Sequence, residues 1–259
     1  MEKLNRDELF SLAINLDLPS LLKFCRTNRH FSEKICARNE IWDYHLNKDF
    51  PDYRILNLDK NMNKKEIYQL LYSLVDVKDK LKIGGSIYEL YNLKTLKFSW
   101  NDLTEIPEGL TKLVNLQILN LSGNKLTEIP ASLGNLVNLQ TLDLTHNKLT
   151  EIPTSLGNLV NLQILNLAMN QLTEIPASLG NLINLRELSL SYNKLTEIPE
   201  SLGNLVNLRE LSLTYNKLTE IPKSLGNLVN LRKLYIAENN LTKQEKTKIK
   251  RKYGDRVAI

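Results

Sequence analysis

The side chains best suited to chemistry in this sequence are three histidines and two cysteines: His30, His45, His146, Cys25 and Cys36. Imidazoles and thiolates ligate zinc and carry nucleophilic or acid–base catalysis. Their positions predict neither use, because the histidines are far apart in the chain and the cysteines lack metal-ligand spacing. The sequence also has no phosphate-loop, zinc-protease or serine-hydrolase motif. We therefore expect a protein that is not an enzyme and that uses no cofactor and no metal.

A different set of polar side chains recurs at an interval of 23 residues. A carboxamide donates and accepts hydrogen bonds at once, so it can satisfy the backbone groups of a turn. The asparagines in question are Asn101, Asn124, Asn147, Asn170, Asn193, Asn216 and Asn239. Around each of them the chain reads L-x-x-L-x-L-x-x-N-x-L, which is the signature of a leucine-rich repeat. The sequence therefore predicts an α/β leucine-rich repeat solenoid with a parallel sheet in the form of a horseshoe.

One repeat, residues 138–160, shows why this spacing gives coils. Leu142 and Leu144 alternate with polar residues, as in a short strand with one buried face. Asn147 is expected to bond to the backbone of its own coil and the next one, forming a ladder. Pro153 stops a helix from starting at Ile152, and the chain then returns over the convex side. Gly157 is expected to supply a tight or positive-φ position there.

Four regions follow from this pattern. Residues 1–53 have apolar positions at helical spacing and predict a small α-helical bundle. Residues 54–91 predict a connecting helix and a degenerate N-terminal capping repeat. Residues 92–241 hold seven repeats, and residues 242–259 form a C-terminal cap with Ile249 and Tyr253 turned inward.

The segment LNRDELFSLAINLDLPSLLKFCRTNRHFSEKICARNEIWDYHL resembles the F-box motif. That motif opens with Leu-Pro-x-Glu, continues with Leu-x-x-Leu-Leu and ends with a late tryptophan, here Trp42. The chain departs from it at Asn5, where the motif has proline. The resemblance implies that the bundle docks on a Skp-type adaptor, and through it on a cullin. The adaptor-binding residues would be Leu4, Asn5, Leu18, Pro19 and Leu22.

The combination of this bundle with near-identical repeats resembles the F-box/leucine-rich repeat proteins of large DNA viruses. That resemblance implies a substrate receptor of a cullin–RING ubiquitin ligase, whose repeats bind the target protein. The alternative is a plain leucine-rich repeat scaffold, with no ubiquitin-ligase link, whose bundle only caps the solenoid. The exposure of the bundle's apolar residues distinguishes the two.

The target is expected on the concave sheet face, where side chains differ between copies while core positions barely vary. Exposed aromatic and methionine side chains in a row are typical of interfaces, although copied repeats also drift wherever packing tolerates it. The expected target-binding residues are Trp100, His146, Met169, Glu187, Tyr192, Glu210 and Tyr215.

Charge and composition limit the possible partners and the compartment. The net charge is +5, and residues 241–259, with seven basic and two acidic side chains, account for all of it. We therefore expect neither a nucleic-acid nor a membrane partner. The N-terminus has no signal-peptide pattern. With only two cysteines, expected to be reduced thiols, the sequence predicts an intracellular, cytoplasmic protein, located in the host cytoplasm if it is viral.

Overall fold

The computed structural model describes residues 4–27 and 29–258, and the chain divides into two compact units, residues 1–91 and 92–259. The first unit is helical. Its elements before residue 50 are α1 (Arg6–Ala13), α2 (Leu18–Thr27), α3 (Arg29–Phe31), a π-helical turn (Ser32–Cys36) and α4 (Asn39–Asp49). A short 3-10 turn (Tyr53–Ile55), α5 (Lys64–Lys80) and α6 (Ile87–Tyr91) complete it.

Asn5, the position that departs from the F-box motif, is the N-cap of α1. Its side chain accepts the N–H groups of Asp7 at 2.9 Å and Glu8 at 3.0 Å, and the Glu8 carboxylate accepts the Asn5 N–H at 2.8 Å. This reciprocal pair is a capping box. Helix α1 ends at Ala13, although apolar residues at helical spacing continue to Leu16.

The predicted connecting helix, α5, belongs to the core of the first unit. The ring of Tyr68 in α5 lies 6.1 Å from the Trp42 ring of α4, between centroids, and its hydroxyl donates to Asp49 at 2.5 Å. Burial, followed by the hydrogen bond to Asp49, raises the pKa of Tyr68. Residues 54–91 therefore complete the hydrophobic core of the helical unit in addition to connecting it to the repeats.

The expectation of two reduced thiols is wrong for this structure. Cys25 of α2 and Cys36 of the π-helical turn form a disulfide, with their Cα atoms 5.9 Å apart. That separation lies within the range that a disulfide spans. The sequence spacing of the two cysteines did not indicate it, because the packing of α2 on the turn brings them together.

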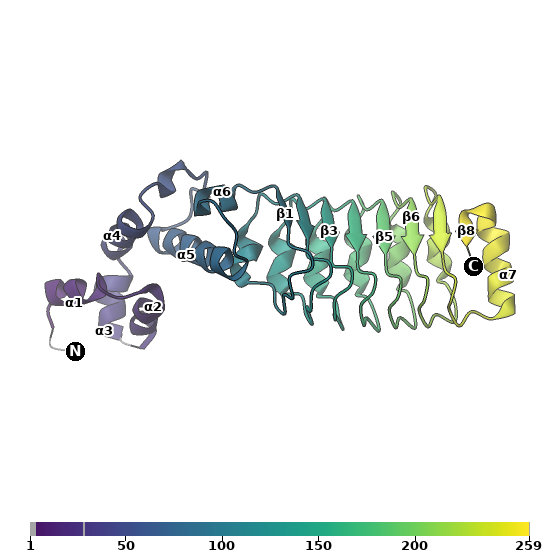
Figure 1. The fold of residues 1–259 in the computed structure, drawn as a ribbon, viewed down its shortest axis with the longest axis horizontal. Helices are drawn as coiled ribbons and strands as arrows, with labels where there is room; N and C mark the ends of the chain where they lie inside the picture. Colours follow the sequence, from purple (N-terminus) through teal and green to yellow (C-terminus); the bar gives the residue numbers. More distant parts are fainter. Residues whose placement is uncertain (1–3, 28, 259) are drawn as a thin grey trace. The chain divides into compact units, whose positions relative to one another are not determined.

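The second unit is the predicted solenoid, and the predicted fold class is confirmed. Its strands form one parallel sheet in sequence order, with equivalent leucines in register from coil to coil. Figure 1 shows the strands side by side, with helical turns on the opposite side of each coil. The strands are β1 (Thr95–Lys97), β2 (Ile118–Asn120), β3 (Thr141–Asp143), β4 (Ile164–Asn166), β5 (Glu187–Ser189), β6 (Glu210–Ser212), β7 (Lys233–Tyr235) and β8 (Val257–Ala258).

Opposite the strands, the return segments form 3-10 turns that begin after the repeat prolines. Gly157 in one of them has no positive φ; instead, a Cβ at this position would collide with the carbonyl oxygen of Ser178 in the next coil. Glycine is therefore needed here for close approach of the coils. The turns are Glu108–Lys112, Ala131–Asn135, Thr154–Asn158, Ala177–Asn181, Glu200–Asn204 and Lys223–Asn227.

The predicted asparagine ladder is present, and it bonds each coil to the preceding one instead of the next. The Asn147 side chain is buried. Its oxygen accepts the Leu126 N–H, and its amide donates to the carbonyls of Leu121 and Leu144, all at 3.0 Å. Leu121 and Leu126 lie in the preceding coil and Leu144 in its own. From Asn124 onward, each asparagine therefore satisfies backbone groups of two coils.

The C-terminal segment packs on the last repeat. Helix α7 (Lys243–Tyr253) buries Ile249 and Tyr253, and the Lys252 ammonium donates to the Lys223 carbonyl at 3.1 Å. β8 then pairs with β7. Within the described ranges, no helix is long and apolar enough to cross a membrane.

We expect Asn147→Ala to lower the free energy of unfolding by about 1–3 kcal/mol, because it leaves backbone groups of two coils without partners. Asn138→Ala is the matched control. Asn138 is exposed and donates one hydrogen bond, to the Val114 carbonyl at 2.9 Å, so its loss should cost about 1 kcal/mol or less. Denaturant unfolding of both variants measures the difference. Equal effects would show that the ladder is not what holds the coils together.

Candidate protein-binding surface

A row of residues just before the ladder asparagines has a left-handed backbone. Their φ angles lie between 54° and 65°, and only one of them is glycine. For other residues this conformation costs about 1–2 kcal/mol each. We call the row the turn ridge: Trp100, Gly123, His146, Met169, Tyr192, Tyr215 and Glu238.

Hydrogen bonds between coils hold the turn ridge in this conformation. The His146 N–H donates to the Ala168 carbonyl at 2.9 Å, and the Asn147 N–H donates to the Met169 carbonyl at 3.2 Å. The same pair of bonds recurs at the next repeats, through Met169, Asn170 and the following residues. These backbone bonds between coils therefore impose the geometry, and the ridge side chains are free to differ.

The second half of the ridge carries a stacked pair of tyrosines. The rings of Tyr192 and Tyr215 lie 4.3 Å apart, between centroids, at an interplanar angle of 14°. Both remain almost half exposed, at 47% and 45%. The neighbouring Tyr192 and Glu238 raise the pKa of Tyr215. Together the two rings offer a rigid apolar surface with polar tips.

The first half of the ridge holds a second aromatic cluster, built around a missing side chain. The Trp100 ring occupies the space that a Cβ on Gly123 would need. It thereby reaches His146, two coils away, with 5.0 Å between ring centroids. Trp100 is 71% exposed. Aromatic surface is therefore not confined to the second half of the repeats.

Most of the predicted target-binding residues lie elsewhere than on the strands. Trp100, His146, Met169, Tyr192 and Tyr215 are in the turns that follow the strands. Sequence reasoning missed this because the column was assigned to the sheet, although Gly123 at the same place is the signal of a turn.

Only two of the predicted target-binding residues, Glu187 and Glu210, lie on strands, in β5 and β6. Glu210 accepts a hydrogen bond from Lys233 at 2.6 Å, and this bond raises the pKa of the lysine. The negative charge that Glu210 offers to a target is therefore partly neutralised.

The residues expected to contact an adaptor do not form one exposed patch. Pro19 is exposed, Leu4 and Leu22 are half-buried, and Leu18 is buried in the core of the helical unit. Asn5 is exposed, but its side chain caps α1. The structure thus brings part of this set to the surface and uses the rest for folding.

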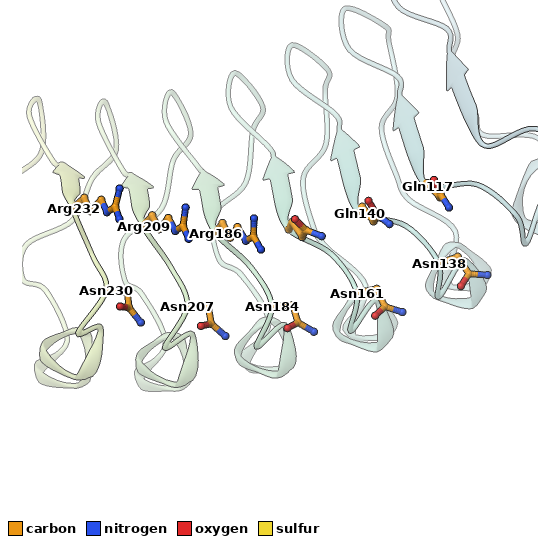
Figure 2. A pocket seen from close by; sticks show the side chains of 11 residues that line it. Gln117, Asn138, Gln140, Asn161, Asn184, Arg186, Asn207, Arg209, Asn230 and Arg232 are labelled. Carbon is orange, nitrogen blue, oxygen red and sulfur yellow. The ribbon is translucent and has the colours of Figure 1, made fainter.

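A polar groove along the starts of the strands was not predicted. Its volume is about 650 Å³. Figure 2 shows two rows of its side chains, one of glutamines and arginines and one of asparagines, pointing to the same side. We call it the amide–arginine groove, lined by Gln117, Asn138, Gln140, Asn161, Gln163, Asn184, Arg186, Asn207, Arg209, Asn230 and Arg232. The column from Gln117 to Arg232, at 23-residue spacing, is the signal that could have found it.

The described part of the chain contains no group of three or more His, Cys, Asp or Glu side chains that could hold a metal ion. His45, one of the chemically able residues, is buried, and its Nε2 lies 3.3 Å from the Ala13 carbonyl. Its Nδ1 atom lies 3.7 Å from the Asp49 carboxylate. Its environment is that of a core side chain, while His146 belongs to the exposed ridge.

Comparisons with known proteins match the repeats. A family model described as a leucine-rich repeat region matches residues 131–252, and one described as two leucine-rich repeats matches residues 91–135. A leucine-rich repeat protein of Leptospira interrogans is similar in structure, with 32% identity and a TM-score of 0.54 over 66% of this chain and 50% of that one. No curated protein matches the chain.

The Arabidopsis receptor kinase HAESA, solved in complex with the peptide hormone IDA and a co-receptor, is also similar. The identity is 39% and the TM-score 0.54, over 58% of this chain and 28% of that one. This chain thus spans half or less of the length of both proteins. Proteins with such repeats are typically non-catalytic binding scaffolds.

We expect Met169→Gly to raise the free energy of unfolding by up to about 1 kcal/mol, because glycine removes the cost of the left-handed backbone at an exposed position. Ala168→Gly, one residue earlier and without a positive φ, should instead lower it by about 0.5–1 kcal/mol. Thermal unfolding of the two variants gives the comparison. If both substitutions destabilise equally, the ridge conformation carries no cost.

Proposed function

Because residues 91–252 are those of a leucine-rich repeat protein, we propose that this chain is a non-enzymatic adaptor whose turn ridge binds a protein target. The main support for this proposal is the exposed, stacked pair Tyr192 and Tyr215, both of which have a left-handed backbone. The chain keeps large side chains where glycine is cheaper and where they contribute little to the core. A binding role explains this better than a structural role does.

The chemistry of the ridge suits a protein surface. Tyrosine rings give large contact area at low entropic cost, and methionine adapts to irregular partners. Such residues are enriched where truncation to alanine costs 2 kcal/mol or more. The similarity to HAESA, whose solved complex contains a peptide hormone, supports a polypeptide partner.

The double variant Tyr192→Ala with Tyr215→Ala tests the ridge. We expect at least tenfold weaker capture of the target, equivalent to about 1.4 kcal/mol or more. The melting temperature should stay within about 2 °C of the wild type, because both rings are exposed. Affinity purification followed by quantitative mass spectrometry measures the captured protein.

The matched control is Glu128→Ala with Glu151→Ala, two exposed side chains of earlier repeats, away from the ridge. We expect no change in capture. The ridge proposal is wrong if this control abolishes capture while the tyrosine variant retains it.

We further propose that the helical unit docks a Skp-type adaptor, and with it a cullin, so that the chain is a substrate receptor in ubiquitin conjugation. The resemblance of residues 4–46 to the F-box motif supports this role, together with the surface positions of Pro19, Leu22 and Leu4. Asn5 is compatible with this role because its side chain caps the first turn of α1, at the position where the F-box motif has a proline. The alternative remains a repeat scaffold without any ligase link.

Pro19→Glu with Leu22→Glu places two carboxylates on this surface without touching buried Leu18. We expect loss of adaptor and cullin from the purified complex, since burying an unpaired charge in an interface is costly. Lys34→Glu, an exposed charge change on the π-helical turn, should keep both. Recovery of adaptor with the double variant, detected by immunoblot, would contradict the ligase role and favour the scaffold.

The location belongs to the same proposal. Docking on a cullin requires the cytoplasm, and the resemblance to proteins of large DNA viruses makes it the host cytoplasm. Fluorescence imaging of the tagged chain in host cells tests this assignment, and a signal confined to a membrane-bound compartment would contradict it.

A further inference from the structure

The amide–arginine groove places three cations side by side without counterions. Arg186, Arg209 and Arg232 are exposed, and within the described part of the chain none of their guanidinium groups makes a hydrogen bond or ion pair. Figure 2 shows the three side chains pointing in the same direction from successive coils. Like charges on adjacent rungs repel one another, so an anionic ligand lying across them would be favoured.

The backbone fixes the spacing of these cations. The Arg209 N–H donates to the Arg186 carbonyl, and the Arg232 N–H to the Arg209 carbonyl, both at 2.8 Å. Successive rungs of a sheet lie about 4.8 Å apart, so the three arginines span about 10 Å. At the far end Arg256 donates to the carbonyl of Leu231, the residue before Arg232, at 3.2 Å, and adds a fourth cation there.

The rest of the groove is neutral and can both donate and accept hydrogen bonds. Each asparagine of its second row donates to a carbonyl of the preceding coil, as Asn184 does to Val160 at 2.8 Å. Its side-chain oxygen takes no hydrogen bond within the described residues, and the side chain lines the groove. Gln117, Gln140 and Gln163 stand where the later coils have arginine.

We propose that this groove binds an extended acidic peptide segment of the protein partner, lying across the strands with its carboxylates over Arg186, Arg209 and Arg232. The inference rests on the proposed protein-binding function and adds a second contact surface to it. The five steps from Gln117 to Arg232 measure about 24 Å, which accommodates about seven residues of extended chain. Guanidinium groups pair with carboxylates in charge-assisted hydrogen bonds.

Two observations favour a peptide over a nucleic acid. The positive charge is confined to one end of the groove, whereas a nucleic acid carries a phosphate at every step along its length. The free amide oxygens of the asparagine row need donors, which the N–H groups of a peptide backbone supply and phosphates do not.

The test uses the full chain and a fluorescein-labelled octapeptide, Gly-Ser-Gln-Ser-Gly-Glu-Glu-Glu, together with its reversed sequence. Fluorescence anisotropy should show one of them binding at least tenfold more tightly than the version with glutamine in place of glutamate. Octathymidylate carrying the same label is the nucleic-acid probe. Tighter binding of octathymidylate than of both acidic peptides, or no preference for glutamate over glutamine, would overturn the proposal.

The repeats themselves supply a conservative variant. Arg186→Gln with Arg209→Gln and Arg232→Gln gives the last coils the residue that the earlier coils carry, so the fold should tolerate it. We expect about tenfold or greater loss of peptide affinity, since three exposed ion pairs are removed. The converse triple, Gln117→Arg with Gln140→Arg and Gln163→Arg, should strengthen binding of a longer glutamate run. Unchanged affinity in the arginine-deleted variant would refute the assignment.

Peptide binding and target capture test the groove and the ridge separately. The Tyr192→Ala, Tyr215→Ala variant should bind the octapeptide as tightly as the wild type does. The two tyrosines follow the C-terminal ends of the strands, whereas the groove residues precede the N-terminal ends. Peptide binding that depends on the arginines, without any tyrosine-dependent capture, would leave the groove assigned and the ridge proposal wrong. Tyrosine-dependent capture without peptide binding would leave the ridge assigned and the groove proposal wrong.

Discussion

The solenoid depends on a buried carboxamide that belongs to two coils at once. From Asn124 to Asn239, each ladder asparagine accepts at least one N–H of the preceding coil and donates to carbonyls of both coils. Leucine burial supplies most of the favourable free energy, but burial has no direction. The asparagine bonds have a direction, and they fix the height at which one coil lies against its neighbour. The left-handed turn beside each asparagine is held by backbone hydrogen bonds to the following coil.

That constraint separates what must be constant from what can vary. Between the buried leucines and the ladder, few positions in a repeat are free to change. The turn ridge and the residue before each strand are among them, and both carry side chains that differ between copies. The ridge is aromatic and the groove is polar and cationic, so two surfaces of different chemistry border the same strands. A partner long enough to contact both surfaces would place apolar residues on the ridge and acidic residues in the groove.

The fold of the repeats could be predicted because the same interactions recur from coil to coil. The strand positions and the ladder follow from the 23-residue period, and the inward faces of Ile249 and Tyr253 follow from helical spacing. Trp100 and Tyr192 were predicted on strands because alternation was extended beyond the strand's end. The disulfide and the packing of Tyr68 on Trp42 each depend on one contact between distant segments, which no pattern in the sequence records. The groove was missed because glutamine and arginine look unrelated until they are stacked.

The near-identity of the coils also bears on how the chain reaches its folded state. A coil that skips its neighbour and docks on the next one finds the same leucines and the same asparagine bonds, so local contacts hardly oppose the error. Such misassembly is characteristic of repeat proteins. Only the ends of the array are unlike the rest. The C-terminal segment closes one of these ends through the pairing of β8 with β7 and the contact of Lys252 with the Lys223 carbonyl, so it marks the last coil of the stack.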